Sequence, residues 1–233
     1  LLYIMKIFVL SMDNEVGEKR RSLLNYEFEW IKSVEIDEEL ISKFIFRHNA
    51  GEKHRKGVMG CLASHLHIMK KIVDEKLDDV IICEDDTFMI DKIDTKNINE
   101  VCLLSGRIHH PSNWGEDKNF QKNVVDTIKF EEGVNSIDYN SYRWTGTDAI
   151  YYPSYQKALE LYNDIMKTKR FKHLDIMIAN NRYIKYLYYP TPFIMIDNNF
   201  SQISKKGQGI TYNYKYIKDV KTKNKLLKDY KIY

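Results

Sequence analysis

Short apolar runs along the chain alternate with stretches of helical periodicity. Runs of this length, bounded by turn-forming residues, are typical of buried strands. The strands predicted in this way are Ile7 to Leu10, preceded by Ile4, and then residues 44–46, 80–83, 101–104, 149–152, 186–189 and 193–196.

Helices are predicted between these strands. The clearest has Leu62, Leu66, Met69 and Val73 on one face, directly after a loop expected at residues 51–60. In that arrangement Ser64 and His65 would fall in the first helical turn, where backbone N–H groups are free. Further helices are expected from Glu18 to about Ile31, from Pro153 onward with apolar residues at helical spacing, and in a short segment after His173.

Strands that alternate with helices predict an α/β fold, with a mostly parallel sheet that carries helices on both faces. In such sheets the ligand crevice lies beyond the carboxyl ends of the strands. We expect one domain over residues 1–203, followed by a tail over residues 204–233.

Charge separates the tail from the body. The net charge is +3, but nine lysines and two aspartates between Lys205 and Lys231 give the tail +7, which leaves about −4 for the body. A basic, Tyr-rich tail can meet nucleic acid or an anionic membrane surface, or it can be a solvated terminal helix. The body has no basic stripe in its sequence, which argues against nucleic-acid binding.

Cysteine usage and hydropathy bear on location. The three cysteines are an odd number in apolar surroundings, which favours free thiols in a reducing compartment. No window of the sequence is apolar over the length that a bilayer requires. We therefore expect a cytoplasmic protein without a signal peptide, with peripheral membrane contact through the tail as an alternative.

An acidic triplet, Glu84, Asp85 and Asp86, directly follows the strand predicted at 80–83. Alternation along an extended backbone would send Glu84 and Asp86 to one side and Asp85 to the other. Two converging carboxylates repel each other, and a hard divalent cation such as Mg²⁺ or Mn²⁺ removes that conflict. The alternative is a solvated loop that caps the strand.

Two other segments bear on this interpretation. Arg20 and Arg21 follow the first strand, where a guanidinium suits a diphosphate; a surface pair on a helix is the alternative. The segment GVMGCLASH carries glycines that would let the backbone approach a ligand. His65 within it is a candidate for the site or, equally, a helix-end histidine without a role in chemistry.

Three segments together resemble glycosyltransferase family 25, which includes lipopolysaccharide β-galactosyltransferases and collagen galactosyltransferases. They are KIFVLSMDNEVGEKRR, GVMGCLASHLHIMKKIVDEKLDDVIICEDD, and GTDAIYYPSYQKALELY followed by HLD. The likeness extends over roughly residues 5–203, and the middle segment is its most specific part.

The resemblance implies a GT-A-like, inverting glycosyltransferase that uses a UDP-sugar and Mn²⁺ or Mg²⁺. Glu84 and Asp86 match the metal-binding acidic motif. The residues implied in donor binding are Ser11, Met12, Asp13, Arg20, Gly60, Ser64, His65 and Asp85. Gly146, Tyr151 and Asp175 match later conserved segments of the family. The implied acceptor is a hydroxyl of a glycan, a lipopolysaccharide or a glycoprotein.

Inversion requires a carboxylate that takes the proton of the attacking hydroxyl. Asp175 is our first candidate for that base and Asp148 the second, while a helix N-cap is the alternative role for Asp175. The aromatic residues Trp114, Tyr142, Trp144 and Tyr151 are candidates for stacking on a sugar or base, or for core packing.

Two other functions remain open from the sequence. One is a non-catalytic module that holds a nucleotide or glycan in a transferase-like fold. The other is a metal-dependent phosphohydrolase, which would need further clustered ligands; His109 and His110 are the candidates for that role.

Overall fold

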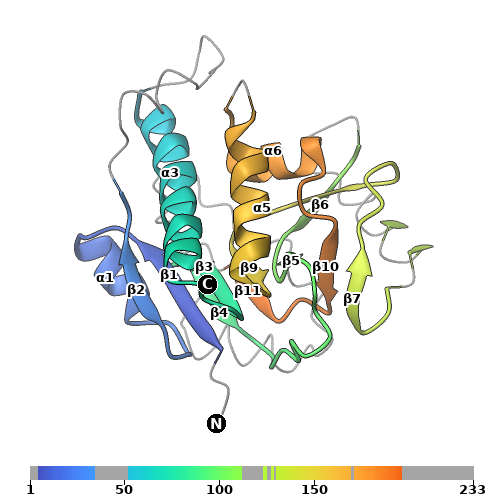
Figure 1. Cartoon of the computed structure of the whole chain (residues 1–233), viewed down its shortest axis with the longest axis horizontal. Coiled ribbons are helices and arrows are strands. Elements are labelled where there is room, and N and C mark those ends of the chain that lie inside the picture. The colour runs from blue at the N-terminus through green and yellow to red at the C-terminus, as the bar shows by residue number, and fades with distance from the viewer. Residues whose placement is uncertain are drawn as a thin grey trace.

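The computed structural model describes residues 5–34, 52–111, 123–124, 127–128, 130–168 and 171–195. Helices and strands alternate up to residue 84, and several mostly short strands then follow one another up to residue 152 (Figure 1). In chain order they are β1 (Lys6–Ser11), α1 (Glu15–Arg21), β2 (Glu29–Lys32), α3 (Glu52–Asp74), β3 (Val80–Glu84), β4 (Thr87–Met89), β5 (Cys102–Leu103), β6 (Arg107–His109), β7 (Gly133–Ser136), β8 (Arg143–Thr145), β9 (Ala149–Tyr152), α5 (Tyr155–Met166), α6 (Leu174–Asn181), β10 (Tyr186–Tyr189) and β11 (Phe193–Met195).

A seven-stranded sheet in the order β2-β1-β3-β9-β5-β10-β7 forms the centre of the molecule. Five of its strands run in the same direction, and β9 and β7 run against them. This arrangement confirms the predicted α/β class and the mostly parallel sheet, and it agrees with a Rossmann-like GT-A fold. Two short two-stranded sheets, β4 with β11 and β6 with β8, lie beside it.

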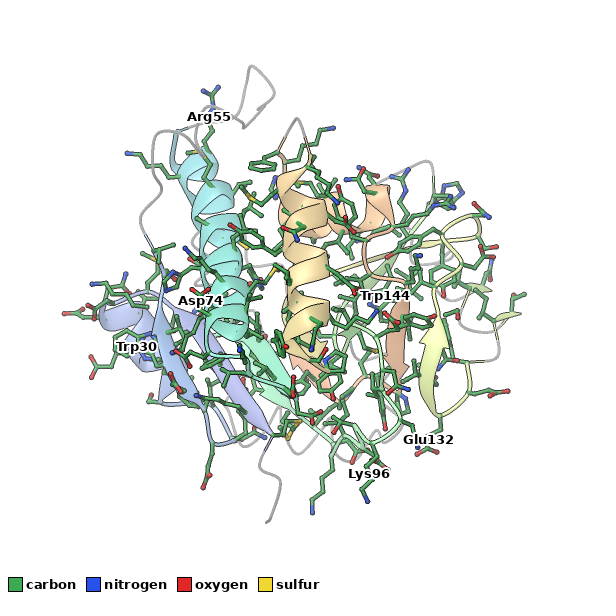
Figure 2. The ribbon with its side chains drawn as sticks, viewed as in Figure 1. Trp30, Arg55, Asp74, Lys96, Glu132 and Trp144 are labelled. Carbon is green, nitrogen blue, oxygen red and sulfur yellow. The ribbon has the colours of Figure 1, made fainter. Side chains whose placement is uncertain are left out.

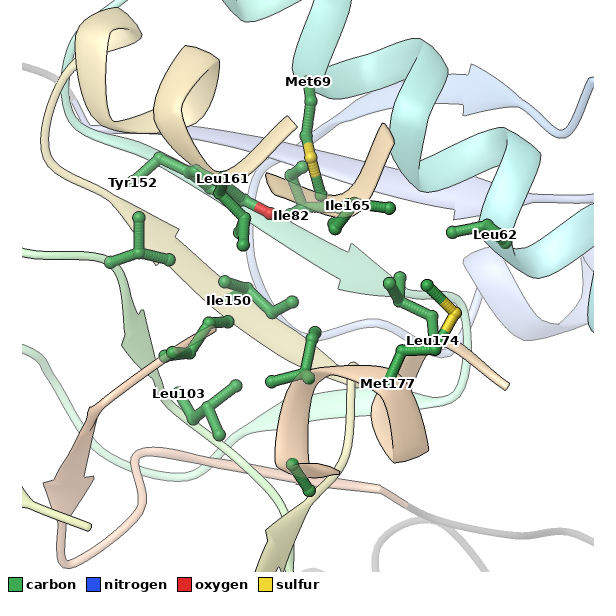
Figure 3. Close-up of a cluster of buried hydrophobic side chains, with 14 of the residues drawn as sticks. Leu62, Met69, Ile82, Leu103, Ile150, Tyr152, Leu161, Ile165, Leu174 and Met177 are labelled. Carbon is green, nitrogen blue, oxygen red and sulfur yellow. The ribbon is translucent and has the colours of Figure 1, made fainter. Parts of the chain in front are cut away.

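Alternation along the central strands creates two apolar layers. Phe8 and Leu10 of β1 belong to the core beneath the helices, whereas Ile7 and Val9 face the opposite side. Figure 3 shows side chains of α3, α5 and α6 meeting those of β3, β5 and β9 in the first layer. In the described part of the chain, the second layer is covered by the segment 22–28 and by β4 and β11 rather than by a long helix.

Three local predictions were wrong. The helix expected over 18–31 ends at Arg21, and residues 29–32 form β2, because the aromatic residues between them pack on the second layer. The loop expected at 51–60 is helical from Glu52, so Gly57 and Gly60 lie inside α3. Pro153 does not begin a helix; Ser154 caps α5, and its hydroxyl accepts a hydrogen bond from the Lys157 N–H.

Several predictions lie outside the described residues. They are the strand at 44–46, the stacking role of Trp114, and the tail over 204–233 with its proposed partners. Within the described ranges, no helix combines the length and the apolar character needed to cross a membrane.

Candidate active site

Strand direction brings distant segments to one edge of the sheet. β1 and β3 are parallel neighbours with Leu10 opposite Glu84, so both end at this edge. β9 runs antiparallel to β3 and therefore begins where β3 ends; the Glu84 N–H donates to the Asp148 carbonyl over 2.9 Å. A cleft of about 610 Å³ opens here, between the ends of β1 and β3 and the side of α3.

Ser11 and Arg20 hold Asp85. The Ser11 hydroxyl donates to Asp85 Oδ2 over 2.7 Å, and Arg20 Nη1 donates to Asp85 Oδ1 over 2.8 Å. Burial raises the pKa of Asp85, although Arg20 and Ser11 oppose that change. Gly17 permits this close approach of α1 to β1, because a Cβ there would lie 2.1 Å from the Met12 carbonyl oxygen.

Asp86 presents a carboxylate oxygen to the cleft. Its Oδ2 lies 3.8 Å from Arg20 Nη1, while its buried Oδ1 has no hydrogen-bond partner among the described residues. Burial and then the charge of Glu84 raise the pKa of Asp86 well above its usual range. A buried acceptor without a donor, next to a second carboxylate, fits a hard divalent cation with oxygen ligands. Asp86 and Glu84 would hold such an ion.

Glu84 interacts with a different set of residues from the two aspartates. Its Oε1 accepts a hydrogen bond from the Thr147 hydroxyl over 2.7 Å and lies 3.6 Å from His65 Nε2. Burial opposes the charged form of Glu84, but His65 and Thr147 outweigh it and lower the pKa of this carboxyl. Glu84 is thus ionised under conditions in which Asp86 holds its proton more tightly.

Asp148 adjoins Glu84 at the start of β9. Its Oδ2 accepts from the Ser105 hydroxyl over 3.0 Å, and its Oδ1 lies 3.8 Å from Arg107 Nη2. The residue is 3% exposed. Burial raises the pKa of Asp148 to about 6 against the opposing effect of Arg107. A carboxyl with such a pKa can accept a proton near neutral pH.

Asp175 lies in the first turn of α6, where His173 rather than Asp175 is the N-cap residue. Its Oδ1 accepts from the Ile176 N–H over 2.7 Å. The side chain is half-buried, and its charge acts on Cys61, Arg107 and Asp148. Asp175 therefore belongs to the group of residues around Glu84, although it lies far from them in the sequence.

The structure brings most of the candidate residues together. Those that line the cleft are Ser11, Met12, Asp13, Arg20, Gly60, Ser64, His65, Glu84, Asp85 and Asp86. Asp148 and Asp175 do not line it and adjoin it through Glu84. His109 and His110, the candidates for phosphohydrolase ligands, are not among the lining residues.

Three expectations about the positions of site residues were wrong. Ser64 and His65 lie well inside α3 rather than in its first turn, so their backbone N–H groups are not free. Asp85 does not point away from its neighbours, because β3 ends at Glu84 and the following turn lets Arg20 contact both aspartates. The alternative of a helix-end histidine is wrong as well, since His65 is mid-helix and fully buried.

The aromatic candidates that the structure describes pack in the core. Trp144 is fully buried, and its indole N–H donates to the Ser105 carbonyl over 2.9 Å (Figure 2). Tyr142 and Tyr151 are also almost completely buried, so stacking on a ligand is excluded for these three side chains in this conformation. Trp30 of β2 is exposed (Figure 2). The guanidinium of Arg21 lies 3.9 Å from the centre of its indole ring.

Sequence reasoning missed several residues of the site. Thr147, Ser105 and Arg107 lie in segments without a clear period, and only the pairing of β9 with β3 and β5 brings them to the carboxylates. The sequence pattern indicates only a free thiol at Cys61. Its spacing of four residues from His65 could have placed both on one helix face, but only a correct start for α3 makes that argument possible.

The mostly parallel α/β sheet, with a cleft of carboxylates at its strand ends, defines a Rossmann-like fold of the GT-A type. The sequence matches the model of the family described as glycosyltransferase family 25 (LPS biosynthesis protein) over residues 4–143. The chain belongs to this family and is a glycosyltransferase. No curated protein matches the sequence closely enough to count as a relative.

Proposed function

We propose that this glycosyltransferase moves a hexose, galactose or glucose, from a UDP-sugar to a hydroxyl of a glycan, lipopolysaccharide or protein acceptor. The reaction inverts the anomeric carbon and requires Mn²⁺ or Mg²⁺. The observation that carries the proposal is that Glu84 and Asp86 line the same cleft, and that a buried Asp86 oxygen has no protein donor in the described chain.

Glu84 and Asp86 would hold the cation, which would supply positive charge against the leaving diphosphate. Ser11, Arg20 and Asp85 form the wall of the cleft next to it. Because Arg20 is already engaged with Asp85, its role is to fix the acidic turn rather than to bind the diphosphate alone. Gly60 has no side chain on this part of α3, and beyond its chain neighbours and the backbone of its own helix, no atom of the described residues lies within 4 Å of where a Cβ would be.

Asp175 is the proposed base and Asp148 the second candidate. Asp175 is half-buried and thus can be reached by an acceptor, whereas Asp148 is almost fully buried and its Oδ2 is already bound by Ser105. Asp148 instead positions Arg107 and, through its backbone, the end of β3. In this assignment Asp175 removes the proton of the acceptor hydroxyl as that oxygen attacks the sugar.

A screen of UDP-sugars with Mn²⁺ tests the proposal, with UDP release and transfer to added saccharides as the readouts. At least one donor should be turned over. Asp86→Asn should lower that turnover at least about 100-fold, because a lost ligand costs more than the 10- to 100-fold typical of outer-shell partners. The exposed Asp91, on the loop after β4, supplies the matched control Asp91→Asn, which should keep full activity.

The melting temperature of each variant, measured in parallel, shows that the protein remains folded. Full activity of Asp86→Asn would contradict the cation site. A rise in melting temperature with UDP and Mn²⁺, but no turnover of any donor, would instead favour a non-catalytic module that binds nucleotides.

A further inference from the structure

Cys61 and His65 lie one helical turn apart on α3 and face the same carboxylate. Residues four apart in a helix are neighbours on its surface. Glu84, at the end of β3, lies opposite this pair, and one ligand atom from each of the three residues lies within 4.8 Å of the others. All three residues line the cleft.

Two of the three distances between ligand atoms are close to those around a tetrahedral ion. With Zn–N and Zn–O near 2.0 Å and Zn–S near 2.3 Å, ligand atoms around Zn²⁺ lie roughly 3.3 to 3.8 Å apart. Glu84 Oε1 lies 3.6 Å from His65 Nε2 and 3.9 Å from Cys61 Sγ. Small side-chain adjustments would therefore bring three ligands around one ion, and the cleft leaves the fourth position open to water.

His65 provides an independent sign of a missing partner. The side chain is 0% exposed, and within the described part of the chain Nδ1 has no hydrogen-bond partner, while Nε2 faces Glu84 Oε1 at 3.6 Å, beyond hydrogen-bond distance. Buried polar groups are almost always paired, because an unpaired group costs roughly 1 to 3 kcal/mol. A bound cation would satisfy Nε2, which points to Glu84.

We propose that Cys61, His65 and Glu84 form a site for a borderline divalent cation, Zn²⁺, that is distinct from the oxygen-ligand site. Thiolate and imidazole ligands favour Zn²⁺ over Mg²⁺ or Mn²⁺. The Cys61 thiol releases its proton to solvent when the ion binds. The Thr147 hydroxyl, which donates to Glu84 Oε1, orients this ligand from outside the coordination sphere.

The two cation sites share Glu84. If the proposed function is correct, Zn²⁺ bound at Cys61 and His65 withdraws Glu84 from the ion that binds the donor diphosphate. Zn²⁺ would then inhibit the transferase and compete with Mn²⁺. Only this consequence rests on the proposed function, since Zn²⁺ binding itself does not.

Titration of the full metal-free chain with Co²⁺ tests the site directly. Co²⁺ should give the visible absorption of a tetrahedral centre and a near-ultraviolet charge-transfer band from a thiolate, and Zn²⁺ should displace it. Cys61→Ala should abolish the charge-transfer band. His65→Gln should weaken Zn²⁺ binding at least about 100-fold, beyond the effect of losing an outer-shell partner.

Matched controls exist for both variants. Cys102→Ala removes a thiol that lies in the second apolar layer, and His67→Gln changes an exposed imidazole on the same helix. Both should keep the Co²⁺ spectrum. An unchanged charge-transfer band in Cys61→Ala, or an octahedral Co²⁺ spectrum in the parent protein, would overturn the proposal. Circular dichroism confirms that each variant is folded.

Competition between the ions tests the sharing of Glu84 without any turnover assay. The spectrum of free Mn²⁺ in electron paramagnetic resonance disappears when the ion binds to the protein. One equivalent of Zn²⁺ should restore that signal in the parent protein but not in Cys61→Ala. Simultaneous binding of both ions would show that Glu84 is not shared, and a failed donor screen would leave this result unaffected.

Discussion

Arg20 contacts two consecutive aspartates: its Nη1 lies 2.8 Å from Asp85 Oδ1 and 3.8 Å from Asp86 Oδ2. The Arg20 and Asp85 side chains are each only 10% exposed, so this interaction takes place largely out of water. One cation from α1 thus compensates part of the negative charge that the end of β3 brings into the cleft.

Loss of this cation should destabilise the fold in a pH-dependent way. Arg20→Gln should cost about 3 kcal/mol of unfolding free energy at pH 7, because it leaves buried carboxylates unpaired. Without Arg20 the pKa values of Asp85 and Asp86 rise further above their usual range, so protonation relieves the repulsion. The deficit should therefore shrink as the pH falls toward 4.

Urea unfolding at several pH values measures this effect. Lys19→Gln removes an exposed positive charge from the same helix and serves as the control. It should change the unfolding free energy by less than about 0.5 kcal/mol. A deficit for Arg20→Gln that stays constant with pH would contradict the proposed charge compensation.

The assignment of the base predicts a difference between two aspartates. Asp175→Asn should lower transfer to an acceptor by about 100- to 10,000-fold, with little change in donor affinity, because the amide cannot take the proton. Asp148→Asn should have a smaller effect, through the position of Arg107. Steady-state kinetics of transfer, with donor binding measured separately, distinguishes the two residues. A larger loss in Asp148→Asn would exchange their roles.

Asp148 should lower stability near neutral pH. Its folded pKa of about 6 exceeds the value near 3.9 expected in the unfolded chain, so the folded state binds the proton more tightly. The contribution of this carboxyl is fully present below about pH 4 and is lost as the pH rises through 6. Asp148→Asn keeps an acceptor for Ser105. At pH 7 its unfolding free energy should exceed that of the parent by on the order of 2 kcal/mol.

Thermal unfolding of Asp148→Asn and the parent across pH 4 to 8 checks this sign. The two curves should converge at low pH and separate above about pH 6. Equal stability of the two proteins at every pH would show that the Asp148 carboxyl is not destabilised by its burial.

Two glycines should respond to alanine in opposite ways. Gly106 has φ +139°, and a Cβ there would lie 2.1 Å from Trp144 Nε1. Gly106→Ala should therefore lower the unfolding free energy by about 3 kcal/mol or more. Gly60 lies inside α3, and among the described residues outside its own helix backbone none would contact an added Cβ, so Gly60→Ala should raise the unfolding free energy by about 0.5 to 1 kcal/mol. If a donor approaches this backbone, Gly60→Ala should also raise the KM for the UDP-sugar while stability increases. Denaturant unfolding and donor titration give the two readouts.

The elements with strong local signals could be predicted from the sequence. The apolar runs at β1, β3 and β9 and the period of α3 gave correct element types, and the acidic triplet marked the right edge of the sheet. These features depend on short-range patterns that the chain reveals directly. The resemblance to family 25 then assigned ten residues that line one cleft.

The remainder depends on pairing between distant segments. The helix predicted over 18–31 failed because Tyr26 and Phe28 pack against each other, and Tyr26 also packs against Phe193, which tertiary contact alone specifies. Glycines at 57 and 60 suggested a loop, but packing of α3 on the sheet outweighs their low helix propensity. Thr147 and Ser105 join the site through strand pairing, which no local pattern indicates.

The hydrogen bond between Ser105 and Asp148 has an evolutionary consequence. These residues open and close a 42-residue excursion of the chain, and their side chains are hydrogen-bonded at 3.0 Å. A segment with both ends fastened together can be lengthened, shortened or exchanged at low entropic cost to the rest of the molecule. The turns of this excursion can thus accept insertions, whereas β7, which pairs with β10, and the buried Trp144 tie the excursion to the central sheet and the core.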